Sequence, residues 1–338
     1  MQIAYISNRP EVLRETLVHV EHFMPWVDDV LVVAPAASIP SFVLGRSVTF
    51  ISDDEAAGDL APELPRLDHS SCNYVLRRGM IKSGAVAEQF VMSDDDYRPI
   101  KPVPLDVFVE DGRHHCYYSY DLAAWRRAET DFDNCQRVTY QALRYLGYSH
   151  LSFAAHMPQV IDRQVLADAF DAVAAITDSN ALCEWSLYFN YGRRHRPDLF
   201  HAPRVFRTMC WPEYPNEWPY WVRPEEYTFE NFYPSLYEPG QLFQGLTTAL
   251  DADTVERTNF EKILRWSQLE VRTAKLDFPT DVGTPWLKDS WSRRAFFRLA
   301  RSLRKVYDYV ALEDRVRLNE LAGAVDRLEH EAETGSGS

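Results

Sequence analysis

Cysteine is scarce in this 338-residue chain, which has five, none of them in a CxxC spacing. An odd and scattered set argues against a disulfide framework or a cysteine-based zinc site and indicates reduced thiols. Long apolar runs are also missing, because none approaches the ~20 residues that span a bilayer, and no signal peptide precedes the first strand-like segment. We therefore expect a cytoplasmic protein, at most peripheral at the inner face of the membrane.

Positive charge is in short supply as well, since the formal net charge is −14. Nucleic-acid binding needs clustered lysine and arginine over the binding face, so we expect no nucleic-acid partner. The sequence has no GxGxxG, GxxxxGK[ST], HExxH or GxSxG motif. These absences argue against a dinucleotide enzyme, a P-loop NTPase, a zinc protease of the HExxH type and an α/β-hydrolase.

Apolar runs alternate with helical patterns in the first two thirds of the chain, which predicts an α/β fold with a doubly wound sheet. Strands are expected at residues 3–6, 30–33, 48–51 and 89–93. Helices are expected at residues 12–23, 73–87, 134–147, 162–175 and 184–191. Asn8 is the expected N-cap of the first helix, with Pro10 in its first turn.

The pattern divides the chain into three parts. Residues 1–205 are expected to form the catalytic domain, and 206–284 to be proline- and aromatic-rich loops and helix packed on it. Residues 285–334 are expected to form a long helical extension. Within it, 288–306 reads as a basic amphipathic helix, suited either to an anionic membrane surface or to packing on the acidic domain. The apolar spacing near the end of the extension suggests a short coiled coil, hence a homo-oligomer.

The strongest motif is the acidic trio Asp94, Asp95 and Asp96, which follows the fourth apolar run, Phe90 to Ser93. Open α/β sheets bind ligands beyond the carboxyl ends of their strands, where this trio is expected to lie. Carboxylates are the ligands that Mg²⁺ and Mn²⁺ prefer, and such an ion would neutralise a departing nucleoside diphosphate. Asp94 and Asp96 are separated by one residue, a spacing that can place one carboxylate oxygen on the metal and another on ribose or a bound water.

This order of strands, followed by the trio, resembles the nucleotide-binding half of GT-A glycosyltransferases, which have a Rossmann-type mixed sheet flanked by helices. Locally the chain is also similar to Stealth proteins, bacterial sugar-phosphate transferases. The pieces that carry this second likeness are Glu11-Val12-Leu13-Arg14 through Pro25-Trp26-Val27, the trio followed by Pro99, and His156-Met157-Pro158 with Arg163 and Leu166. A further group of bacterial GT-A-like proteins is similar at Cys183-Glu184-Trp185-Ser186-Leu187-Tyr188.

The resemblance implies a divalent cation and a nucleotide-sugar donor, with a glycan or lipid-linked acceptor. Asp94 and Asp96 would hold the metal, and His201 would complete its coordination. Residues implied to bind the donor are Asn8, Arg9, Asp53, Asp54, Arg78, Lys82 and Asp95, and Arg77 would also face phosphate. Arg77, Arg78 and Lys82 could instead belong to a solvated helix surface without a role in binding.

Two residues are expected to be catalytic. His156 precedes a Met-Pro pair, and its imidazole could bind the metal, the diphosphate or an acceptor hydroxyl, or be structural. Glu184 lies at a helix start, where it could be the general base or merely complement the helix dipole. Trp185 and Tyr188 beside it are expected to bind the acceptor.

Three functions remain open at this point. The first is a glycosyltransferase of bacterial cell-surface polysaccharide synthesis. The second is a Stealth-like transferase that moves a sugar-1-phosphate and releases a nucleoside monophosphate. The third is a non-catalytic scaffold of a glycan-assembly complex that acts through the C-terminal helix.

Overall fold

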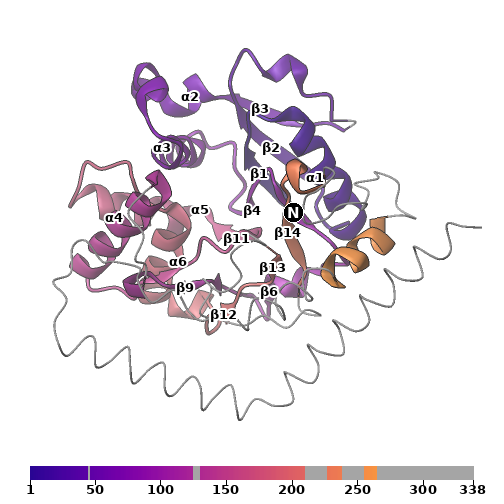
Figure 1. The fold of residues 1–338 in the computed structure, drawn as a ribbon. Coiled ribbons are helices and arrows are strands. Elements are labelled where there is room, and N and C mark those ends of the chain that lie inside the picture. The colour runs from indigo at the N-terminus through magenta and orange to yellow at the C-terminus, as the bar shows by residue number, and fades with distance from the viewer. Residues whose placement is uncertain (45, 125–129, 210–226, 238–254, 265–338) are drawn as a thin grey trace, which may run out of the picture.

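A five-stranded sheet organises the protein, and it is built from the N-terminal half of the chain (Figure 1). The computed structural model describes residues 1–44, 46–124, 130–209, 227–237 and 255–264. The strands of the main sheet are β1 (Gln2–Ile6), β2 (Asp29–Ala34), β3 (Thr49–Ser52), β4 (Gln89–Asp94) and β11 (Gln159–Asp162). The helices are α1 (Pro10–Phe23), α2 (Asp53–Ala57), α3 (His69–Lys82), α4 (Asp131–Tyr145), α5 (Arg163–Ala174) and α6 (Glu184–His195).

The strand order is β11-β4-β1-β2-β3, with β11 antiparallel to β4 and the other neighbours parallel. The predicted α/β class is therefore confirmed, and the sheet is mixed. Parallel strands buried on both faces are continuous apolar runs, as Val30 to Val33 are here, all completely buried. The register pairs Ile6 with both Val33 and Asp94. The carboxyl ends of β1, β2 and β4 consequently lie at one edge.

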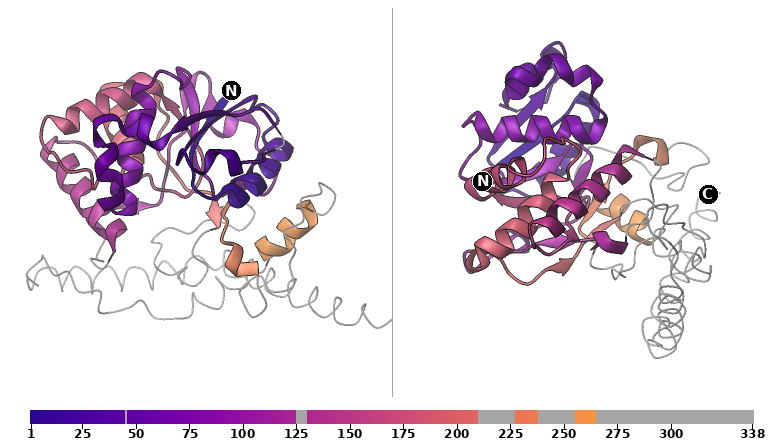
Figure 2. Two further views of the ribbon diagram at one scale, coloured as in Figure 1. Left: turned by 90° about the horizontal axis from the view of Figure 1, so that it is seen from above. Right: turned by 90° about the vertical axis from the view of Figure 1, so that its left-hand side faces the viewer.

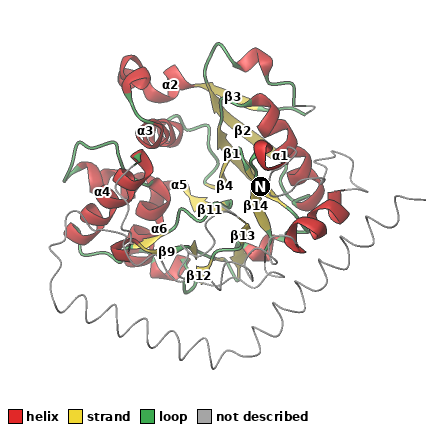
Figure 3. Ribbon diagram, viewed as in Figure 1, coloured by secondary structure: helices red, strands yellow, loops and turns green. Residues whose placement is uncertain are grey.

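Helices cover the sheet from opposite sides (Figures 1 and 3). Helix α1 lies on one side. Helices α3, α4, α5 and α6 pack against one another and form a second group on the other side, which the left-hand view of Figure 2 shows apart from the indigo part of the chain. Short strands complete the described part. They are β5 (Tyr97–Pro99), β6 (Val109–Glu110), β7 (Arg113–His114), β8 (Tyr117–Tyr118), β9 (Tyr120–Asp121), β10 (Leu151–Ser152), β12 (Arg204–Val205), β13 (Thr208–Met209) and β14 (Phe229–Asn231).

Several helix starts differ from the prediction, those of α1 and α3 among them. Arg9, not Asn8, is the N-cap residue of α1, and no side chain caps that helix, although Pro10 is in the first turn as expected. Helix α3 begins four residues before the predicted position, because the side chain of Asp68 accepts a hydrogen bond from the Ser71 amide at 2.8 Å. A cap formed by a side chain in a proline-rich loop is hard to recognise from apolar spacing.

A buried charge network attaches the later segments to this core. Arg98 of β5 donates to Glu230 of β14, and Lys262 in helical residues 255–264 lies 3.2 Å from the same carboxylate. All three side chains are almost completely buried. The two cations and the Tyr237 hydroxyl, which donates to Glu230 at 2.8 Å, lower the pKa of Glu230 to about 2 despite its burial.

The predicted basic helix at 288–306, the extension 285–334 and most of 206–284 lie outside the described residues. Within the described ranges, no helix combines the length and the apolar character that a membrane span requires.

Gly79 tests the packing of α3 on α2. A Cβ atom at this position would lie 1.6 Å from the carbonyl oxygen of Ala56, so the backbone of α2 would have to move. We expect Gly79→Ala to lower the free energy of unfolding by about 3 kcal/mol in urea titrations. Gly84→Ala is the control, because nothing lies within 4 Å and only its positive φ costs about 1 kcal/mol. Equal losses would contradict the packing.

The buried side chain of His19 in α1 should make the stability of the fold depend on pH. Its Nδ1 donates to the Pro99 carbonyl at 2.9 Å, and burial, aided by Arg98, lowers its pKa from 6.5 to about 3. The unfolded chain therefore takes up this proton first, and the fold loses about 1.4 kcal/mol per pH unit as the pH falls from 6.5 towards 3. His19→Gln should remove this loss in urea titrations at pH 7, 6 and 5. The exposed His69→Gln should follow the wild type, and parallel profiles for all three proteins would refute the interpretation.

Candidate active site

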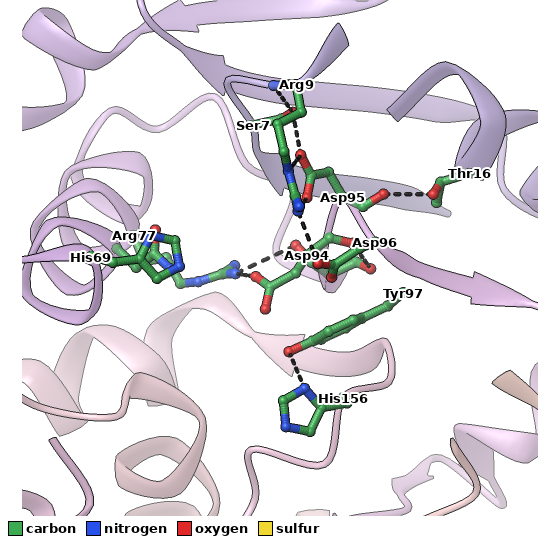
Figure 4. Close-up of polar contacts among 12 residues, drawn as sticks. Ser7, Arg9, Thr16, His69, Arg77, Asp94, Asp95, Asp96, Tyr97 and His156 are labelled. Atoms are coloured by element: carbon green, nitrogen blue, oxygen red, sulfur yellow. Dashed lines mark hydrogen bonds and ion pairs between the residues drawn. The ribbon is translucent and has the colours of Figure 1, made fainter. Parts of the chain in front are cut away.

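The acidic trio lies at the carboxyl edge of the sheet, as predicted. Asp94 is the last residue of β4, Asp95 and Asp96 form the turn that follows, and β5 then leads away. Ser7 and Arg9 follow the adjacent strand β1 at the same edge. Figure 4 shows Arg9 reaching the trio from one side and Arg77 of α3 reaching it from the other.

Asp95 anchors the turn through hydrogen bonds to the segment after β1 and to α1. One of its carboxylate oxygens accepts hydrogen bonds from the Ser7 hydroxyl at 2.6 Å and from Arg9 Nε at 3.1 Å, and the other accepts from the same guanidinium. Its backbone carbonyl accepts from the Thr16 hydroxyl at 2.5 Å. Asp95 is 3% exposed, and its role in donor binding stays a prediction. Asp95 fastens β4 to β1 and α1.

Asp94 is held by a buried arginine. The guanidinium of Arg77, which is completely buried, contacts the Asp94 carboxylate through Nη2 and Glu184 Oε1 through Nε at 2.6 Å. The side chain of Asp94 is still 26% exposed, whereas that of Glu184 is 8% exposed. Asp94 thus keeps surface towards the site while Glu184 serves mainly as the second partner of Arg77. The pKa of Glu184 is raised by burial, against the opposing charge of Arg77.

Asp96 carries the most perturbed carboxyl group of the trio. Burial first, and then the charges of Asp94 and Asp95, raise its pKa from 3.8 to about 7, although Arg9 lies 2.9 Å away and lowers it. The ion pairs at this edge join four carboxylates to two guanidinium groups, which leaves a formal charge of −2. The carboxylates are those of Asp94, Asp95, Asp96 and Glu184, and the guanidinium groups are those of Arg9 and Arg77. The site is therefore short of positive charge.

This deficit fits a hard divalent cation. Asp94 and Asp96 flank the anchored Asp95, and both keep part of their carboxylate surface exposed. Carboxylate oxygens are the donors that Mg²⁺ and Mn²⁺ prefer, and one such ion would balance the residual charge. The described residues thus satisfy the chemical requirement for the predicted metal at these two positions.

An aromatic wall borders the trio on the side of α6. Tyr97 lies between the trio and His156, and its hydroxyl is 3.4 Å from Nδ1 of that histidine (Figure 4). His156 adopts a positive φ of 50°, and burial lowers the pKa of its imidazole to about 4, so the ring is neutral near pH 7. Trp185 is 5% exposed and lies under the Arg77 guanidinium at 5.1 Å. It supports Arg77 and has little surface for an acceptor, contrary to the prediction.

The predicted donor-binding residues divide into two sets. Asp53 and Asp54 begin α2 at the carboxyl end of β3, so they share the edge with Asp94, roughly 14 Å away at three strand spacings. Asn8 is exposed at the same edge. Lys82, in contrast, is the exposed last residue of α3, beside the loop that enters β4 from the opposite edge. Lys82 thus lies away from the edge that carries Asp94, and Arg78 is half-buried on α3.

Tyr188 and His201 lie in other surroundings than the sequence suggested. Tyr188 is completely buried, and its hydroxyl accepts a hydrogen bond from the Asp162 amide at 2.8 Å, so it is a core residue and not an acceptor contact. His201 does not join Asp94 and Asp96. Its ring stacks on that of His115. Together with Glu110, these two histidines make the one group of three metal-ligand side chains found in the described ranges.

Ser7, Thr16 and Tyr97 belong to the site and were not predicted. Ser7 directly follows the first strand and Tyr97 directly follows the trio, so the strand-end rule that selected Asp94 could have selected both. Thr16 lies inside a helix and meets Asp95 across 79 positions of sequence, for which the sequence gives no signal. Arg77 was expected to face phosphate, but it is completely buried between two carboxylates.

Arg77 tests this arrangement. Arg77→Met removes the cation between Asp94 and Glu184 and leaves the buried Glu184 carboxylate unpaired, so we expect the free energy of unfolding to fall by about 3–5 kcal/mol in urea titrations. Arg78→Met, one residue along the same helix, is the matched control and should cost less than about 1 kcal/mol. A similar loss in both variants would show that the ion pairs of Arg77 are unimportant.

Comparison with known proteins gives neighbours by structure only. No protein-family model and no curated protein matches the chain. Mouse xyloside xylosyltransferase 1 in its apo form is 11% identical at a TM-score of 0.41, over 71% of this chain and 100% of that one. The galactosyltransferase LgtC, in complex with donor and acceptor sugar analogs, is 12% identical at a TM-score of 0.38, over 77% and 95%. Both neighbours are glycosyltransferases by name.

Proposed function

We propose that the protein is a metal-dependent glycosyltransferase that takes its sugar from a nucleotide-sugar donor. The observation that carries the proposal is the residual charge of −2 at the carboxyl edge of the sheet, where Asp94 and Asp96 keep exposed carboxylate surface beside the anchored Asp95. A nucleoside diphosphate is itself anionic, so it would be repelled from this edge unless a cation came with it. A divalent cation and a diphosphate together match the site.

Asp94 and Asp96 would hold the cation. When bound, the ion supplies charge neutralisation for the diphosphate as the bond to the sugar breaks. Arg77 and Glu184 would fix the position of Asp94, because both are buried and paired with each other. Their role is to position a ligand-binding carboxylate.

The donor would lie along the edge of the sheet. Arg9 is the site's more exposed arginine, with 43% of its side chain accessible, and it precedes the first turn of α1. A helix N-terminus and a guanidinium both favour phosphate oxygens. Asp53 and Asp54, about three strand spacings away, would then meet the ribose or base of an elongated nucleotide.

The acceptor would approach from the side of His156. Its neutral imidazole can exchange a hydrogen bond with a sugar hydroxyl, and the ring of Tyr97 lies beside it at a centroid distance of 5.6 Å. Following the sequence resemblance, the acceptor would be a glycan or lipid-linked sugar of a bacterial surface polysaccharide.

Thermal shift with a nucleotide panel tests the proposal. Mn²⁺ or Mg²⁺ together with a nucleoside diphosphate should raise the Tm by several degrees, because a ligand at one hundred times its Kd stabilises the fold by about 2.7 kcal/mol. Asp94→Asn and Asp96→Asn should each remove most of this rise and reduce transferase activity by at least about a hundredfold.

The matched control is Asp106→Asn, which changes an exposed aspartate outside the trio and should leave both the Tm rise and the activity unchanged. Product analysis completes the test. Release of a nucleoside diphosphate is the expected outcome, whereas release of a monophosphate would replace sugar transfer by sugar-1-phosphate transfer. A wild-type protein whose Tm responds to no nucleotide with metal would overturn the proposal.

A further inference from the structure

We propose that Glu110, His115 and His201 form a second metal site, separate from the acidic trio, which binds a zinc-like divalent ion. One ligand atom from each of the three side chains lies within 4.8 Å of the other two. The inference does not depend on the proposed transferase function, since none of these residues contacts the trio in any described hydrogen bond or ion pair.

Three neighbouring segments bring the residues together. Strands β6 and β7 pair in a short hairpin, in which Glu110 is the last residue of β6 and His115 directly follows β7. The His115 amide donates a hydrogen bond to the Phe108 carbonyl at 2.8 Å. His201 arrives from a distant part of the chain, and its amide donates to the His114 carbonyl at 2.9 Å. Backbone bonds on both sides therefore fix the three positions before any ion binds.

The contact between His115 and Glu110 has the dimensions of a metal site. His115 Nε2 lies 3.2 Å from Glu110 Oε2. Two ligands of a tetrahedral zinc ion, each about 2.0–2.2 Å from the metal, lie roughly 3.4 Å apart. The His115 side chain is completely buried; its Nε2 contacts Glu110, and its Nδ1 has no hydrogen-bond partner in the described part of the chain. A buried polar group without a partner is costly, and a metal ion would supply the missing interaction.

The second histidine is oriented as ligating histidines usually are. One ring nitrogen of His201, Nε2, donates to the backbone carbonyl of Glu110 at 3.0 Å, and such a bond to a carbonyl sets the tautomer and direction of a metal ligand. The rings of His115 and His201 stack with centroids 4.4 Å apart, so the two imidazoles already share one location.

The donor set selects the kind of ion. Two imidazoles and one carboxylate suit zinc and similar transition metals, whereas Mg²⁺ prefers oxygen ligands throughout. The Glu110 side chain is 51% exposed, so the ion can enter from solvent and would keep a coordination position open to water. A bound ion would also tie the β6–β7 hairpin to the segment that leads into β12.

Zinc titration of the full-length protein, after treatment with and removal of a chelator, tests the proposal. Isothermal titration calorimetry should show one zinc equivalent whose Kd rises at least about tenfold in Glu110→Gln and in His201→Gln. These two side chains are exposed or half-buried, so their variants should fold, whereas a variant of the buried His115 could fail for structural reasons alone. Zinc should also raise the Tm of the wild type, and less so that of the two variants.

Two controls make the outcome specific. His195→Gln changes an exposed histidine elsewhere and should bind zinc like the wild type. The double variant Asp94→Asn/Asp96→Asn should keep this zinc equivalent, and excess Mg²⁺ should not displace it. Absence of zinc binding by the wild type, unchanged affinity in both ligand variants, or loss of the equivalent in the Asp94/Asp96 variant would each overturn the proposal.

Discussion

The ion pairs of Arg77 with Asp94 and Glu184 are the constraint on which the candidate active site depends. A completely buried guanidinium is stable only where carboxylates surround it, and here they come from β4 and from the first turn of α6. The same contact therefore joins the helix group to the edge of the sheet and fixes the direction of Asp94. Asp95 does the equivalent on the other side, through Ser7 and Arg9.

Once these anchors are in place, the site retains more negative than positive charge. Burial first, and then the charges of the neighbouring aspartates, raise the pKa of Asp96 to about 7. An uncompensated buried charge is destabilising. An imbalance that persists at the carboxyl edge of a mixed sheet is explained if a cationic ligand restores neutrality.

Much of the sheet and the position of the trio could be predicted from the sequence, because both follow from short-range patterns. Continuous apolar runs such as Val30 to Val33 identify buried strands, and the strand-end rule then places Asp94 at the edge. Tyr188 and Trp185 were misplaced because an aromatic residue near a helix start has no period that distinguishes a core face from a site. Nothing in the sequence indicates that His201 lies beside His115, because the two residues are 86 positions apart and are brought close by backbone pairing of their segments, as between residues 114 and 200.

The most direct test of the central claim is the position of a bound cation. Crystals of the protein grown with Mn²⁺ and a nucleoside diphosphate would reveal the metal by its anomalous scattering. A manganese peak at a carboxylate oxygen of Asp94 or Asp96, with the diphosphate on its other side, is the expected result. Density for the nucleotide with no manganese at either aspartate would contradict the account.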